Sequence, residues 1–248
     1  MRIVLWLLFL GCSVLHADTL SDLKTALAAL DVREPVKARV EIGSVQRNGD
    51  DSKEDRHSPI VTALVEDGPQ GLTITWDRAL LQAAGTEMQA KDKDPNQSTP
   101  TRSSMDELKP TALNDYLNAP ATVLRLLDQA RLVEEKPDTW EGRPARLLSF
   151  EMTPPLSDKD KKIIKAAEMT ARLWLGADGL PVALETRFHA KGRALLVISF
   201  ETTQSEEFRF ARMGRRLVVV RHLVEIQSSG GGQNGMKHSL VTLSPVES

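Results

Sequence analysis

The side chains best suited to chemistry at neutral pH are four histidines in the body of the chain, because an unperturbed imidazole has a pKa of about 6.5. Three of them are expected in a polar loop, on the polar face of a strand and at the start of a strand. Their spacing matches no helical or hairpin metal site, so we predict no metal ligands. These three are His57, His189 and His238.

His222 differs from them because it lies in an apolar run, between Val220 and Val224. A buried imidazole there could bind the head group of a ligand or titrate. Alternatively, it is an ordinary hydrogen-bonded histidine, which is the more frequent situation in proteins. Glu225 follows three residues later, so on a strand it points to the opposite face. These two residues therefore cannot form a catalytic pair by themselves.

The sequence contains no G-x-S-x-G motif, which marks the nucleophile of many secreted hydrolases. The glycine cluster at residues 230–235 lacks the lysine of a phosphate-binding loop and is expected to be a hairpin tip. The pair Glu206-Glu207 is expected to be solvated charge. We therefore predict no catalytic residues, no metal and no cofactor, and a protein that is not an enzyme. An enzyme with dispersed catalytic residues is the third alternative.

The N-terminal segment has the features of a secretory signal peptide. Arg2 precedes an apolar run at residues 3–10, and Leu15-His16-Ala17 is a plausible signal-peptidase cleavage site that ends in a small residue. The apolar run is shorter than the roughly 20 residues that span a bilayer. We predict that residues 1–17 are removed and that residues 18–248 form a single domain in a bacterial periplasm.

The only cysteine, Cys12, lies within this segment, in Leu10-Gly11-Cys12. This tripeptide partly resembles the motif at which bacterial lipoproteins are acylated, and anchoring at Cys12 is the minority alternative to a soluble product. Cleavage after Ala17 would leave a chain without any thiol. Disulfides and thiolate sites are then excluded from the mature protein.

Composition places the chain among ordinary globular proteins. It has 248 residues, 41% of them hydrophobic and 27% charged, which is enough to bury one sizeable core. The formal charge of −2 gives no electrostatic reason to bind nucleic acid or an anionic membrane. No apolar segment after residue 17 is long enough to cross a bilayer, and we expect a monomer.

Hydrophobic periodicity predicts a helix, then strands, then a helical centre. Leucines spaced by three and four residues predict an N-terminal helix over residues 20–30, and alternation predicts strands at 36–44, 60–66 and 72–76. Further helices are expected at 79–88 and, as two helices meeting near Pro120, at 111–133, with a loop at 91–104 between them. A strand at 145–150 and a helix beginning near Ser157 complete this region, where Ser157 and Asp160 form a capping box.

The C-terminal third predicts an antiparallel meander. Asp178-Gly179 is a hairpin signal between two strands at 171–175 and 180–188. Apolar and polar residues alternate in the second of these strands. Further strands are expected at 194–203, 217–226 and 240–243.

This order of elements, together with two short motifs, resembles a known family. The motifs are Trp140-Glu141-Gly142-Arg143-Pro144-Ala145 and Leu173-Trp174-Leu175-Gly176-Ala177-Asp178-Gly179-Leu180-Pro181. They are similar to segments of the LolA/LolB-like superfamily of bacterial periplasmic lipoprotein carriers and its predicted periplasmic members. The resemblance implies an incomplete antiparallel barrel around an apolar cavity that helices cover and acyl chains enter. No polar cavity residue of that family is assigned to a position here.

We therefore expect an α+β protein in which a curved antiparallel sheet, an incomplete half-barrel, carries two or three helices on its concave side. The predicted ligand cavity is bounded by residues of the meander and by a helical lid. The meander residues are Leu184, Phe188, Ile198, Phe200, Val218, Val220 and His222, and the lid residues are Leu117, Leu124 and Leu127.

The function expected from this fold is a non-enzymatic periplasmic carrier or chaperone whose partner is a lipid or the acyl chain of a lipoprotein. The alternative is an envelope interaction or sensor module that binds a protein segment without lipid transport, for example at an open sheet edge. A hollow barrel favours the carrier, whereas a filled barrel favours the interaction module.

Overall fold

The computed structural model describes residues 13–30, 34–49, 55–194 and 198–246. Strands and helices alternate in blocks along the chain rather than one by one, which is typical of an α+β protein. The strands are β1 (Val36–Asn48), β2 (Arg56–His57), β3 (Val61–Gly68), β4 (Gly71–Trp76), β5 (Ala130–Trp140), β6 (Arg143–Met152), β7 (Ile164–Leu175), β8 (Pro181–Ala194), β9 (Ile198–Met213), β10 (Arg216–Gly230) and β11 (Gln233–Pro245). The helices are α1 (Ser13–Ala28), α2 (Arg78–Lys93), α3 (Pro100–Glu107), α4 (Pro110–Leu117), α5 (Ala119–Gln129) and α6 (Asp160–Ile163).

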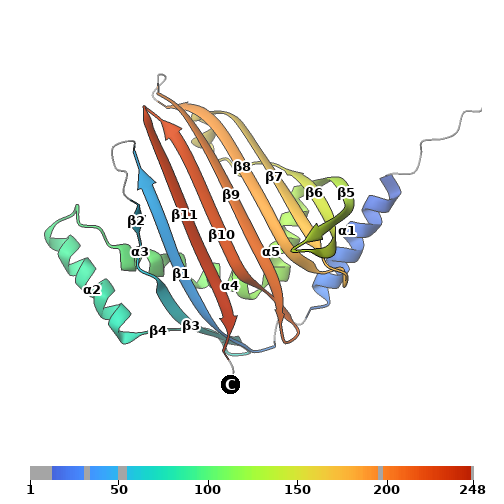
Figure 1. Ribbon diagram of the computed structural model, residues 1–248, viewed down its shortest axis with the longest axis horizontal. Helices are drawn as coiled ribbons and strands as arrows, with labels where there is room; N and C mark the ends of the chain where they lie inside the picture. Colours follow the sequence, from blue (N-terminus) through green and yellow to red (C-terminus); the bar gives the residue numbers. More distant parts are fainter. Residues whose placement is uncertain (1–12, 31–33, 50–54, 195–197, 247–248) are drawn as a thin grey trace, which may run out of the picture.

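All of these strands belong to one antiparallel sheet, in the order β4-β3-β1-β11-β10-β9-β8-β7-β6-β5, with β2 paired to β1 (Figure 1). The sheet is curved and does not close, so β4 and β5 are its two edges. Neighbours in the second half follow one another in the chain, and the C-terminal strand β11 pairs with β1 to join the two halves. The predicted α+β fold with a curved, incomplete antiparallel barrel is thereby confirmed.

Helices cover one face of this sheet, which we call the inner face (Figure 1). Helices α4 and α5 pack against β10, and α1 packs against α5. Helix α2 contacts α3 and lies to one side of the sheet. The described residues form six helices in all, and α4, α5 and α1 are the ones that cover this face next to β10, in line with the two or three helices expected there.

The core lies between the inner face and these helices. Alternating residues of the strands point into it, because successive side chains of a strand face opposite ways. Each fully buried leucine stabilises the fold by roughly 1.5–3 kcal/mol. The largest fully buried side chains are Phe150, Leu27, Ile42, Leu108, Leu113, Leu117, Leu148, Leu173, Leu175, Leu184, Val40 and Val61.

The junction of α4 and α5 confirms the predicted kink. Pro110 and Pro120 stand in the first turns of their helices, where a missing backbone N–H costs nothing. The carbonyl of Leu117, at the end of α4, accepts a hydrogen bond of 2.9 Å from the buried guanidinium of Arg216. The same guanidinium lies 2.7 Å from Asp67 on β3. Arg216, on strand β10, therefore holds the kink between the two helices in place.

Two predicted elements differ from the observed ones, and one observed edge strand was not predicted. The capping box forms, with Ser157 Oγ donating to Asp160 at 2.6 Å, but α6 is a single turn and β7 begins at Ile164 because that segment pairs with β8. The expected loop at 91–104 contains the start of α3. Strand β5 was not expected, because it is charged and contains Pro137, which an edge strand tolerates.

The predicted signal peptide lies largely outside the described residues, which begin at Ser13; Cys12 lies outside them as well. Helix α1 runs through Ala17, the predicted cleavage position. Removal of residues 1–17 therefore stays a prediction. None of the helices among the described residues is long and apolar enough to cross a membrane.

Candidate functional site

A pocket of about 370 Å³ opens on the inner face, between strands β7 to β9 and the segment that leads into α6. Its floor is formed by the sheet: Met169, Phe188 and Gln204 lie directly opposite one another on the three strands, so their side chains share a face. Thr186 and Glu206 form the next row. Pro155, Leu156, Asp160 and Ile164 complete the lining.

The pocket lining combines apolar side chains with two carboxylates. Met169 and Phe188 are only partly buried, so they offer apolar surface to a ligand. The acidic groups are Asp160 and Glu206, and the described residues that line the pocket include no lysine, arginine or histidine. Such a site fits a molecule with an apolar body and a polar end.

Glu206 is held by two hydrogen bonds. Its Oε1 accepts from Gln204 Nε2 at 2.6 Å, and its Oε2 lies 3.0 Å from His222 Nε2. Burial alone would raise the pKa of the Glu206 carboxyl, but the hydrogen bond and the charge of His222 outweigh burial and lower that pKa. Glu206 is therefore ionised at neutral pH.

Asp160 is also ionised. The hydroxyl and the backbone amide of Ser157 donate to its Oδ2 at 2.6 and 2.9 Å, and these hydrogen bonds lower the pKa of the Asp160 carboxyl. The described residues form no ion pair with Asp160. Its negative charge therefore remains available at the pocket.

Behind Glu206, a hydrogen-bonded chain links the sheet to the helices. Tyr116 on α4 lies with its hydroxyl 3.0 Å from Nδ1 of His222, and the Phe208 ring stacks on the imidazole at a centroid distance of 4.0 Å. Burial raises the pKa of the Tyr116 phenol far above its usual value, and the charge of Glu206 adds to this effect. Because ionised Glu206 can only accept, Nε2 of His222 is the donor between them.

The predicted cavity residues do not surround one cavity. Phe188 lines the inner pocket. His222 does not line this pocket, but it contacts Glu206, which does. Ile198 is exposed and is the first residue of β9. Val220 and Leu124 are partly buried and pack against the core. Four further predicted cavity or lid residues are buried in the core: Leu184, Val218, Leu117 and Leu127.

Phe200 lies at a separate hollow of about 600 Å³, beside Lys191 and Gly192. A Cβ atom on Gly192 would overlap the Phe200 ring and the carbonyl of Ile163. The ring therefore lies against backbone and does not point into the inner pocket.

A β-bulge explains why strict alternation misplaced part of β10. The register shifts between Val219 and Arg221, so Val219 lies opposite Phe210 while His222 lies opposite Phe208. One extra residue changes the face of everything before it. His222 therefore shares its face with Val219 rather than with Val218.

Several pocket residues were not expected. Glu206-Glu207 was interpreted as solvated charge, which is wrong for both: Glu206 lies against His222 on the inner face, Glu207 pairs with Arg209 on the outer face, and their side chains are only 25% and 23% exposed. The alternation Gln204, Glu206, Phe208 on β9 could have indicated a polar patch on the inner face. Met169 and Tyr116 carried no such signal.

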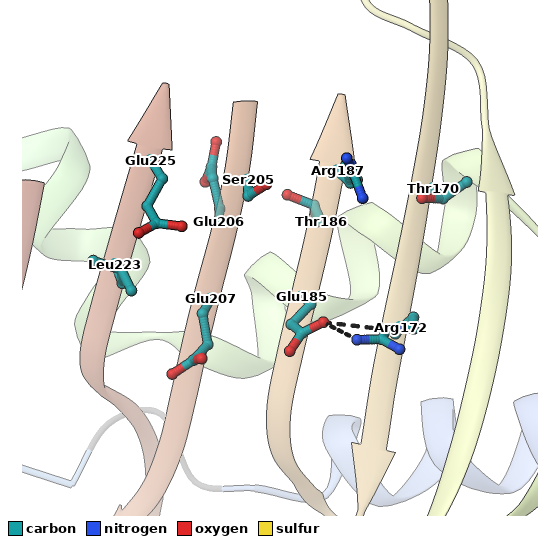
Figure 2. A pocket seen from close by; sticks show the side chains of 10 residues that line it. All are labelled: Thr170, Arg172, Glu185, Thr186, Arg187, Ser205, Glu206, Glu207, Leu223 and Glu225. Carbon is teal, nitrogen blue, oxygen red and sulfur yellow. Dashed lines mark hydrogen bonds and ion pairs between the residues drawn. The ribbon is translucent and has the colours of Figure 1, made fainter. Parts of the chain in front are cut away.

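A second hollow, of about 440 Å³, lies on the outer face of the same strands (Figure 2). Figure 2 shows Arg172 and Glu185 turned toward each other, and the Nε of Arg172 donates to Glu185 at 3.1 Å. Glu207 pairs with Arg209 at 2.8 Å and with Arg221. Most of the charge here is paired across neighbouring strands, as on a solvated sheet face. The inner pocket is therefore the better candidate site.

No group of three or more histidine, cysteine, aspartate or glutamate side chains that could hold a metal ion occurs within the part of the chain that the structure describes.

No model of a known protein family matches the sequence, and no curated protein matches it. Among solved structures, a similar chain occurs in the crystal structure of MucB in complex with MucA(peri). The identity is 12% and the TM-score is 0.25, with 94% of this chain and 99% of that chain covered. A TM-score this low supports no conclusion about the fold or the function of the present protein.

Proposed function

We propose that this protein is a non-enzymatic periplasmic carrier or chaperone that holds an acyl chain, from a lipid or a lipid-modified protein, in the inner-face pocket. The observation that carries the proposal is the pocket of about 370 Å³ with Phe188 and Met169 in its floor. Its volume lies within the range of ligand sites, roughly 300–1,000 Å³. The resemblance to periplasmic lipoprotein carriers and the predicted signal peptide support the location.

Binding would need dispersion contacts and the exclusion of water, but no reaction. Burial of an acyl chain gains about 0.8 kcal/mol for each CH₂ group. The hydrogen-bonded series Tyr116, His222 and Glu206 holds a carboxylate in place. Thr186 is the hydroxyl side chain among the described residues that line the pocket, and it makes no hydrogen bond with Glu206 or His222 that would activate it as a nucleophile. These features support a binding protein rather than an enzyme.

The open sheet edges favour a second candidate function, an envelope interaction module that binds a protein segment. Among the described strands, β4 pairs only with β3, and its residues alternate between exposed and partly buried. Such an edge can accept an added strand from a partner. The two candidates differ in the surface used, so they can be separated experimentally.

The first prediction tests the pocket. Replacing Phe188 by aspartate should reduce the affinity for acyl probes at least tenfold while lowering the thermal midpoint only slightly, because Phe188 is only partly buried. The measurement pairs a thermal midpoint with displacement of a neutral fluorescent acyl probe from the same protein.

Two variants serve as controls for Phe188→Asp. Ile198→Asp, at an exposed position of the same sheet, should change neither the midpoint nor binding. Leu184→Asp places a charge in the packed core and should leave little folded protein. Wild-type protein that binds no acyl probe would contradict the carrier and leave the interaction module as the better proposal.

A further inference from the structure

We infer that the inner-face pocket prefers amphiphiles with a positively charged, ammonium-type head group over amphiphiles with an anionic one. This inference rests on the proposed function and adds the class of head group. It depends on the position of two carboxylates, Glu206 and Asp160, beside the apolar floor of the pocket.

The two carboxylates come from different elements and reach the pocket from different sides. Glu206 belongs to β9 and forms part of the floor, whereas Asp160 begins α6, which follows the segment of Pro155 and Leu156. A ligand whose chain lies on Phe188 and Met169 would therefore place its polar end near both negative charges.

Glu206 keeps the capacity to accept from a ligand. A carboxylate has about four acceptor positions, and Gln204 and His222 each use one. The contact of His222 with Tyr116 holds the imidazole and so holds the carboxylate in place. An ammonium group could then donate to Glu206 without a costly rearrangement of the site.

Ion pairs do not offset both carboxylates, although Lys159, Lys161 and Lys162 lie close to Asp160 in the sequence. His222 is the only basic side chain within ion-pair distance of Glu206 among the described residues, at 3.0 Å, and none of them forms an ion pair with Asp160. Lys161 of α6 pairs instead with Asp158, at 3.3 Å. An anionic head group in this pocket would be repelled by the negative charges of the two carboxylates, and this repulsion is strong at short range.

The test compares three dodecyl probes that share one chain and differ in head group: primary ammonium, neutral alcohol and carboxylate. Calorimetric titration at low salt, below the micellar concentration of each probe, should show the cation binding roughly tenfold more tightly than the carboxylate. The preference should shrink as salt is added, because salt screens charges near the surface.

Substitutions then locate the preference. Glu206→Gln and Asp160→Asn remove one charge each with little change of shape, and each should reduce the ratio of affinities severalfold while the alcohol binds as before. Glu207→Gln removes a charge from the outer face of the same strand and should leave the ratio unchanged. Because the two carboxylates lie on separate elements, Asp160→Asn tests the inference even if Glu206→Gln impairs folding.

The outcomes separate this inference from the proposed function. Equal binding of the three probes, or a preference that the pocket variants do not alter, would overturn the head-group preference and leave the carrier intact. Absence of binding for every probe would contradict the carrier as well.

Discussion

Tyr116, His222 and Glu206 show how a charge is kept beside an apolar surface. The carboxylate stays ionised because His222 donates to it, and His222 is held by a phenol that burial keeps protonated. Each group thus holds its neighbour in position. The three come from α4, β10 and β9, so the arrangement also links a covering helix to the sheet.

Tyr116 is the only tyrosine of the chain, which makes its ionisation directly measurable by ultraviolet absorbance. Its folded-state pKa is raised, so it favours folding fully below the unfolded value of about 10, and this contribution is lost as the pH rises above that value. We predict that tyrosinate forms only together with unfolding.

The matched variant for this prediction is Tyr116→Phe. At neutral pH it should lose about 1 kcal/mol with the hydrogen bond to His222, and its stability should decline less above pH ~10 than that of the wild type. A wild-type phenol that titrates near its usual pKa while the protein remains folded would contradict the buried position of Tyr116.

At the scale of elements, the C-terminal end of β8 makes a close contact with the N-terminal end of β9. Gly192 lies opposite Phe200, whose ring covers the position that a side chain on residue 192 would need. We predict that Gly192→Ala destabilises the protein by about 1–3 kcal/mol, because ring and backbone must shift. Chemical denaturation would measure this loss.

The control is another strand glycine with ordinary space around it. A Cβ on Gly43 would meet its nearest neighbour, Ile60, at 3.5 Å, so Gly43→Ala should be close to neutral. Adding Phe200→Ala to Gly192→Ala should recover part of the loss if the ring is the obstacle. Equal effects of the two glycine variants would contradict this account.

At the scale of the whole molecule, Arg216 joins segments that are distant in sequence. Its side chain is 3% exposed and donates to Asp67 on β3, to the carbonyl of Leu117 on α4 and to the carbonyl of Glu34, at 2.7, 2.9 and 3.1 Å. No apolar residue could satisfy these three acceptors at once.

We predict that Arg216→Ala lowers the free energy of unfolding by about 3 kcal/mol, because it leaves a partly buried carboxylate and a helix-end carbonyl without their donor. Arg212→Ala, which removes an exposed pair with Asp178 at 3.8 Å, should change it by less than about 0.5 kcal/mol. Urea unfolding of both variants gives the comparison; similar losses would refute the role assigned to Arg216.

The sequence by itself determined the kinds of elements in this protein. Some sequence signals act locally, because they set the backbone conformation of the residues that carry them. Examples are the alternation in residues 180–188, the Asp178-Gly179 turn and the prolines that begin α4 and α5. The antiparallel meander and the kinked helix pair were therefore predictable.

Only the tertiary structure decided which apolar residues are core and which are accessible. Leu184 and Phe188 carry the same alternation signal, yet helices cover the first and leave the second at a pocket. The bulge after Val219 changes which side chains share the face of His222. Glu206 is a pocket residue because the segment of Pro155 and Leu156, which comes from another part of the chain, lies over its side of the sheet, and periodicity holds no information about such long-range contacts.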